Sequence, residues 1–188
     1  MDTTGWIIIG VLAVLVLLLV TIYNRLVALR QRTSQSWSDI SVQLKQRHDL
    51  VPNLVETVKG YAGHERGTLE AVVKARNAAV SASGPQAQAQ AEGMLSGALR
   101  QLFALSEAYP DLKANQNFLQ LQAQLTDIEN KIAAARRFFN NATQEYNSAI
   151  QQFPAVIFAG AMGFKPGVFF ELDEAERVAV NTAPQVKF

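Results

Sequence analysis

The chain has 188 residues, of which 49% are apolar and 18% are charged, with 17 basic against 16 acidic side chains. A net charge of +1 argues against a nucleic-acid-binding protein, because binding to the phosphate backbone requires a strongly basic face. The absence of cysteine excludes a disulfide scaffold, a thiolate metal centre and a cysteine nucleophile.

The first element in chain order is an apolar segment from Trp6 to Ile22, which is 17 residues long and contains no charged side chain. As a helix it is roughly 26 Å long, close to the ~30 Å hydrocarbon core of a bilayer. A cleaved signal peptide is the competing interpretation, but Asp2 and no Lys or Arg precede the segment, and no small-residue cleavage site follows it. The sequence therefore predicts a single-pass transmembrane helix with Trp6 and Tyr23 at its two interfaces.

Basic residues flank this span on one side only, at Arg25, Arg30 and Arg32. Because basic flanks are retained in the cytoplasm, we expect the short N-terminus to lie outside and everything after residue 23 to lie inside the cell.

The rest of the chain predicts helices and no sheet, because apolar residues recur at spacings of three and four between widely separated prolines. We expect residues 24–48 to continue the membrane helix, Pro52 to interrupt it, and further helices to span 52–80, 87–108 and 116–152. The last helix carries an unbroken apolar seam, which fits a bundle core or a parallel coiled-coil dimer. Matching stripes on the other helices favour the bundle.

The predicted fold is thus all-α, with a short N-terminus and transmembrane helix over residues 1–23. That helix continues into an antiparallel up-and-down four-helix bundle over residues 24–153. Residues 154–188 form a third region, a short apolar segment followed by a tail of low complexity that we expect to be flexible.

The C-terminal apolar segment is rich in phenylalanine and is too short to span a bilayer. One interpretation is a turn that closes one end of the bundle. The other is an exposed element that docks on a neighbouring subunit or enters the bilayer interface. The candidate self-association residues are Phe153, Phe158, Phe164, Phe169 and Phe170.

The sequence contains no catalytic constellation. His48 and His64 are its only histidines, and they stand outside any zinc-protease pattern. No phosphate-binding glycine loop and no nucleophile-elbow motif is present. We therefore predict no enzymatic activity, no catalytic residue, no metal site and no cofactor.

Several runs of the sequence resemble the LemA family of bacteria, and the resemblance covers essentially the whole chain. The runs that carry it are residues 23–27, 37–40, 43–45, 47–55, 69–72, 75–77, 107–115, 118–122, 135–136 and 146–147, with Pro184, Val186 and Phe188 at the end. The resemblance implies a bacterial membrane protein with one N-terminal membrane helix and a soluble helical bundle. It supplies no active-site residues.

The polar positions that the resemblance marks flank predicted bends, so they cap helices or bind a partner. The candidates are Arg47, His48, Asp49, Asn53 and Asn115.

Two classes of function fit these features. The first is a non-enzymatic, membrane-anchored scaffold that self-associates at the bacterial inner membrane to organise the membrane or recruit protein partners. The second is a membrane-tethered sensor or accessory factor that uses a polar cluster around Arg47, His48 and Asp49 to bind a partner or a small ligand. In both cases the lipid bilayer is a partner and nucleic acid is not.

Overall fold

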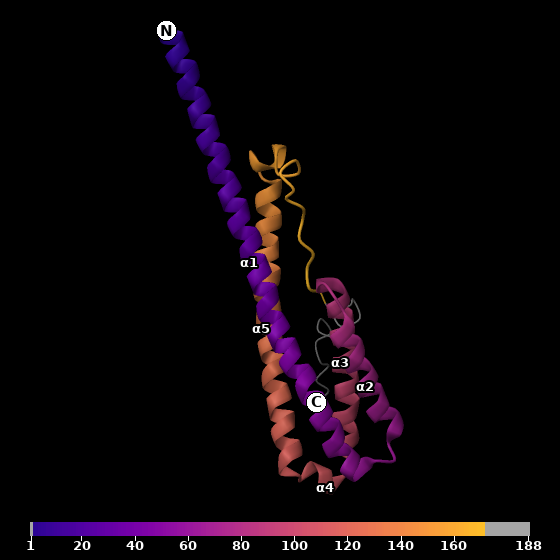
Figure 1. Cartoon of the computed structure of the whole chain (residues 1–188). Helices are drawn as coiled ribbons and strands as arrows, with labels where there is room; N and C mark the ends of the chain where they lie inside the picture. Colours follow the sequence, from indigo (N-terminus) through magenta and orange to yellow (C-terminus); the bar gives the residue numbers. More distant parts are fainter. Residues whose placement is uncertain (1, 172–188) are drawn as a thin grey trace, which may run out of the picture. The chain divides into compact units, whose positions relative to one another are not determined.

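The computed structural model describes residues 2–171 and contains no strand among them, which confirms the all-α class. The predicted flexible tail, residues 178–188, and all but Glu171 of the charged run before it lie outside the described residues. The elements are α1 (Thr3–Ala62), α2 (Arg66–Ser81), α3 (Pro85–Ser106), α4 (Pro110–Lys113), α5 (Gln116–Gln151) and a short 3-10 helix, η1 (Ala155–Ile157) (Figure 1).

The predicted interruption at Pro52 is wrong, because α1 is a single helix of 60 residues with Pro52 inside it. Proline lacks the amide hydrogen that would bond to the carbonyl four residues earlier, here that of His48. In the structure Nε of Arg76 on α2 donates to the His48 carbonyl at 3.3 Å. A neighbouring helix therefore supplies the donor that the proline removes.

The chain turns instead at Gly63, eleven residues beyond Pro52. A Cβ atom added to Gly63 would lie 2.9 Å from the backbone oxygen of Lys59, closer than any side chain tolerates. Only glycine fits this close approach, so the first inter-helix turn follows Ala62 and the second helix is shorter than the predicted 52–80. The third and last helices agree with the predicted 87–108 and 116–152 to within two residues at each end.

The described residues fall into two compact units. The second unit comprises residues 38–137 and 168–171, and it contains the four-helix bundle. Its core draws on α1, α2, α3 and α5, with a further leucine from α4. The core residues are Val51, Leu54, Val55, Val58, Ala62, Leu69, Val72, Ala75, Ala79, Ala91, Leu95, Leu99, Leu102, Leu112, Phe118 and Leu125.

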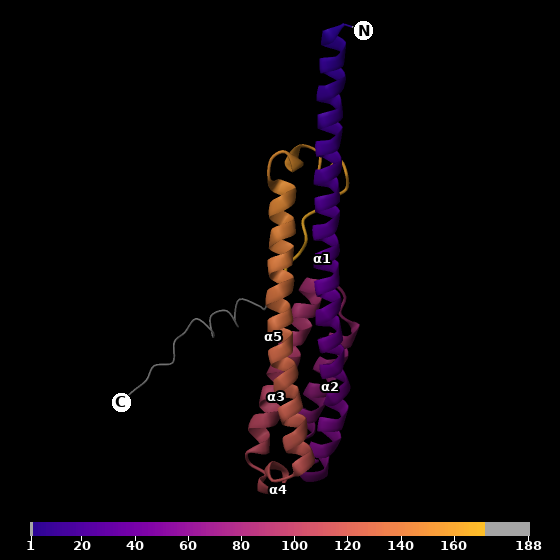
Figure 2. The same ribbon diagram turned by 90° about the vertical axis from the view of Figure 1, so that its left-hand side faces the viewer.

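The first unit comprises residues 2–37 and 138–167. Here α1 and α5 pack side by side, with the Trp37 and Phe139 rings 5.4 Å apart (Figure 2). Arg32 forms an ion pair with Glu145 at 3.0 Å. The core of this unit consists of Leu26, Leu29, Tyr146, Ala149, Ile150, Ala155, Ala159 and Phe164. The segment after α5 therefore folds back onto α1.

Hydrogen bonds hold the end of that segment against α5. The Tyr146 hydroxyl donates to the Lys165 carbonyl at 2.9 Å, and Asn147 exchanges two hydrogen bonds with the backbone of Gly167. Burial raises the pKa of the Tyr146 phenol above its ordinary value. A Cβ at Gly167 would lie 3.1 Å from Cγ2 of Thr143, so glycine permits this close approach.

The N-terminal part of α1 is the one stretch within residues 2–171 that is long and apolar enough to cross a membrane. None of its most apolar window is buried against the rest of the chain. A helix that is apolar on every face and packs against no other part of the protein is stable in the hydrocarbon core of a bilayer rather than in water.

The hydrogen bond between Arg76 and His48 can be tested by a double-mutant cycle with Pro52. We expect Arg76→Ala to lower the free energy of unfolding by about 1 kcal/mol, because the His48 carbonyl loses its donor. Pro52→Ala restores the helical amide, so the cost of Arg76→Ala should be smaller in that background. Urea unfolding of the detergent-solubilised protein, followed by circular dichroism, measures both. If the two substitutions change the free energy of unfolding in a strictly additive way, Arg76 does not replace the amide donor that Pro52 lacks.

Candidate functional site

The structure separates the five predicted polar residues. Arg47 and His48 are buried on α1 within the second unit, whereas Asp49 and Asn53 are exposed on the same helix. Asn115 directly precedes α5, where its side-chain oxygen accepts a hydrogen bond from the amide of Phe118 at 3.0 Å. Asn115 is therefore a helix N-cap, and only Arg47 and His48 belong to a shared polar site.

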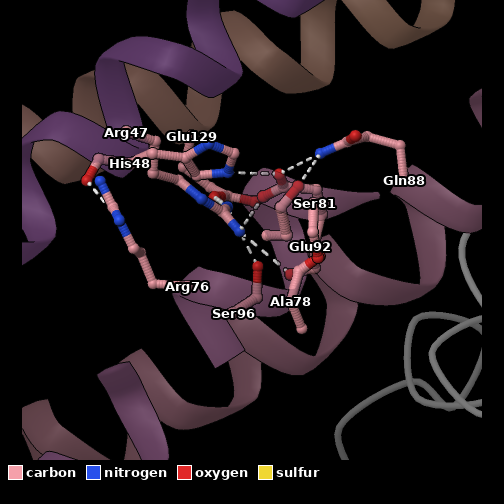
Figure 3. Close-up of polar contacts among 10 residues, drawn as sticks. Arg47, His48, Arg76, Ala78, Ser81, Gln88, Glu92, Ser96 and Glu129 are labelled. Atoms are coloured by element: carbon pink, nitrogen blue, oxygen red, sulfur yellow. Dashed lines mark hydrogen bonds and ion pairs between the residues drawn. The ribbon is translucent and has the colours of Figure 1, made fainter. Parts of the chain in front are cut away.

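Arg47 is the centre of this site, which Figure 3 shows in close-up. Its Nη2 lies 2.8 Å from Oε2 of Glu92 and donates to the Glu92 backbone carbonyl at 3.0 Å. Its Nη1 donates to the Ser96 hydroxyl at 3.1 Å and also to the carboxylate of Glu129. One guanidinium on α1 thus bonds to two residues of α3 and one of α5.

His48 also contacts the Glu92 carboxylate, at its other oxygen (Figure 3). Its Nε2 lies 2.7 Å from Oε1 of Glu92, and the amide of Gln88 donates to the same oxygen at 2.8 Å. Gln88 also donates to the Ala79 carbonyl at the end of α2, at 3.0 Å. We refer to Arg47, His48, Gln88, Glu92, Ser96 and Glu129 as the Arg47 network.

The burial of the central ion pair determines what the network can do. The side chains of Arg47 and Glu92 are 2% and 4% exposed, while Glu129 at the edge is 55% exposed. An isolated buried charge is very costly, so each ion needs a partner of opposite sign and further hydrogen bonds. Each ion is paired with groups from other helices, so the network joins α1, α2, α3 and α5. The pairing is incomplete, because within residues 2–171 Nε of Arg47 has no hydrogen-bond partner and Oε2 of Glu92 has only its ion-pair contact with Arg47. This geometry favours a structural role over acid–base chemistry.

Sequence reasoning missed Glu92, Gln88, Ser96 and Glu129. A signal for Glu92 was nevertheless present, because it lies on the same helical face as Leu95, Leu99 and Leu102. Arg47 likewise occupies the apolar stripe that runs through Leu44 and Val51. Opposite charges that each interrupt an apolar stripe on different helices indicate a buried ion pair.

A second polar cluster lies nearer the surface. The Tyr109 hydroxyl donates to Glu65 at 3.0 Å and lies 2.7 Å from Nε2 of His64. Desolvation and this hydrogen bond to the Glu65 carboxylate raise the pKa of Tyr109. Within residues 2–171 no group of three or more His, Asp or Glu could hold a metal ion.

The five candidate interface phenylalanines have different environments. Phe164 packs in the core of the first unit, and Phe170 is buried in the second. Phe158 and Phe169 are half-buried. Phe153 alone is fully exposed, with 81% of its surface accessible. Two of the five rings therefore serve the packing of the chain itself.

Within residues 2–171, the hollows that adjoin the bundle of the second unit include a larger one and a smaller one. The larger, of about 810 Å³, lies between the end of α1 and α2; we refer to it as the α1–α2 groove. Val55 and Leu69 form its floor, and its edges carry Glu56, Lys59, Arg66, Glu70 and Lys74. The smaller, of about 320 Å³, is bordered by His48 and Gln88 of the Arg47 network and by Lys45, Asp49 and Arg76.

The all-α fold, the unpartnered apolar helix and the buried network define a membrane-associated helical-bundle protein. The model of the LemA family matches residues 36–188. The chain belongs to the LemA family, as the resemblance implied.

Curated relatives match most of the chain. Magnetosome protein MamQ of Magnetospirillum gryphiswaldense is 26% identical over 190 residues, covering 87% of this chain and 70% of MamQ. Magnetosome protein MamQ 2 of Paramagnetospirillum magneticum is 25% identical with the same coverage. Protein LemA of Metamycoplasma hominis is 27% identical over 164 residues, covering 85% of this chain and 74% of its own.

A matched pair of substitutions tests the structural role of the Arg47 network. We expect Glu92→Gln to cost about 3 kcal/mol or more of unfolding free energy, because it leaves a buried guanidinium without its main counter-charge. Glu129→Gln removes a carboxylate from the same Arg47, but one that is largely solvated, so we expect about 1 kcal/mol or less. Urea unfolding compares the two variants. Equal costs would contradict the assignment of Glu92 as the principal counter-ion.

Proposed function

We propose that the chain is a non-enzymatic, membrane-anchored scaffold that self-associates at the bacterial inner membrane and thereby organises the membrane or recruits partners. The observation that carries this proposal is the α1–α2 groove, an apolar-floored surface that nothing in residues 2–171 covers. The polar side chains of the Arg47 network, which are the ones best suited to catalysis or ligand binding, instead bond to one another.

A second copy of the chain is the occupant that the groove fits best. Val73 and Val80 on α2 are 42% and 53% exposed, and their spacing of seven residues places them on one helical face. Val73 also lines the groove, so an exposed apolar side chain stands beside the buried floor. The edges of the groove carry three basic and two acidic side chains, Lys59, Arg66 and Lys74 against Glu56 and Glu70. A twofold pairing of α2 with α2 could place opposite charges face to face.

The oligomeric state in lipid tests this proposal. We expect full-length protein in nanodiscs or liposomes to form dimers or larger assemblies by mass photometry and cross-linking. Val73→Glu should weaken association roughly tenfold or more, because the added carboxylate would be buried against an apolar floor.

Val42→Glu is the matched control, since Val42 is a similarly exposed valine of the second unit outside the groove. It should leave the assembly unchanged. A wild-type protein that stays monomeric at all protein-to-lipid ratios, or equal effects of the two variants, would refute self-association through the groove.

The proposed orientation places the N-terminus outside and the bundle in the cytoplasm, on the evidence of Arg25, Arg30 and Arg32 after the span. The absence of native cysteine makes this testable by labelling single introduced cysteines in intact cells. A membrane-impermeant maleimide should modify Thr4→Cys directly but Val42→Cys, which lies outside both hollows, only after the membrane is permeabilised. The reverse pattern would overturn the orientation.

A second candidate function is the binding of a partner or small ligand at the smaller hollow. The observation in its favour is that His48 and Gln88 connect this hollow to the Arg47 network. Val80→Trp fills the hollow from its exposed edge, and Val42→Trp is the control. Loss of a cellular partner with unchanged thermal stability, in the first variant alone, would favour this function over the scaffold.

A further inference from the structure

We propose that the segment from Phe153 to Met162 inserts its exposed apolar side chains into the membrane interface, as a second point of contact beside the transmembrane helix. We refer to residues 153–162 as the interfacial loop. A single copy of the chain suffices for this contact, so the proposal is independent of self-association.

The first argument is where the loop packs. The core formed by Ala155, Ala159 and Phe164 includes Leu26 of α1, and Ile22 packs against it. The ring of Phe164 meets the ring of Tyr23 edge to face, with centroids 5.5 Å apart. Ile22 is the last residue of the apolar span and Tyr23 follows it, so the loop contacts α1 at the turn where the helix leaves the hydrocarbon core. Figures 1 and 2 both show the segment after α5 at the end of that helix nearest the N-terminal part of α1.

The second argument is what the loop exposes. Its outward side chains are Phe153, Val156, Ile157 and Met162, with Phe153 and Ile157 81% and 70% accessible. A cluster of large apolar side chains in water is unfavourable and marks a binding surface. Near the level of Tyr23 the available apolar medium is the boundary between headgroups and acyl chains. Shallow insertion of such side chains is the usual mode of interfacial binding.

The third argument is the distribution of charge. No charged residue occurs between Glu145 and Lys165, so the loop carries no group that would resist entering the interface. Exposed basic residues border it at Arg25, Arg30 and Lys165, and the guanidinium of Arg30 lies 5.2 Å from the centroid of Phe164. An apolar tip beside basic side chains matches the boundary between acyl chains and anionic headgroups.

Spin labels on single cysteines in the otherwise cysteine-free full-length protein test this placement. The label goes on Ile157→Cys, with Leu17→Cys as the control within the span and Val80→Cys as the control in water. All three native side chains are well exposed in the described structure, so the substitutions should preserve the fold. Nanodiscs that hold one copy each remove contacts between copies.

We expect the label at residue 157 to collide with a water-soluble relaxation reagent roughly fivefold less than the label at residue 80, and to collide with lipid-dissolved oxygen more often. A label at residue 157 that matches the one at residue 80 would overturn the proposal. The same label is also measured in vesicles that hold several copies. Protection that appears in these vesicles but not in single-copy nanodiscs would also overturn the proposal, because it would assign the loop to a protein interface.

A second variant separates insertion from local packing. Phe153→Asp combined with Ile157→Asp changes only exposed side chains, so the core at Phe164 should persist. With the label moved to Met162→Cys, the two aspartates should raise collision with the aqueous reagent severalfold, because charged side chains are excluded from the acyl boundary. An unchanged signal at residue 162 would show that lipid never contacted the loop.

Discussion

The second unit depends on the ion pair between Arg47 and Glu92. Both ions are almost fully buried, and each is stable there only because the other is present. The pair fixes α1 against α3, Glu129 extends it to α5, and Gln88 extends it to α2. An arrangement of the helices that separated the two ions would leave a buried charge without its partner, which is strongly unfavourable.

The same part of α1 accommodates a helix-breaking residue. Pro52 lies one turn beyond His48, and the carbonyl that it deprives of a donor is the one that Arg76 binds. Two consecutive residues of α1 thus link it to three other helices. The Arg47 side chain reaches α3 and α5, the His48 side chain reaches α3, and the His48 carbonyl accepts a hydrogen bond from α2. The continuity of α1 is consequently a product of tertiary contacts, since a proline in an isolated helix costs about 3 kcal/mol.

Much of the fold could be predicted from the sequence because it follows from local periodicity. The apolar span, the helical class and the limits of α3 and α5 all depend on patterns within one helix. The position of the first turn could not be predicted this way, since proline is the stronger local signal and Gly63 the weaker one. For the candidate site, Arg47 and His48 were singled out, but Glu92 was missed because its partner lies 45 residues away in the chain.

The sequence by itself determined that the chain has one apolar span, a helical remainder and a family signature, because these are properties of residue order and composition. Tertiary structure alone decided three other matters. It placed Arg47 and Glu92 in contact, it kept α1 helical through Pro52, and it sorted the phenylalanines into buried Phe164 and Phe170 and exposed Phe153. The physical reason is the same in each case: the free energy of a buried charge, an unpaired carbonyl or an aromatic ring depends on which distant residues surround it.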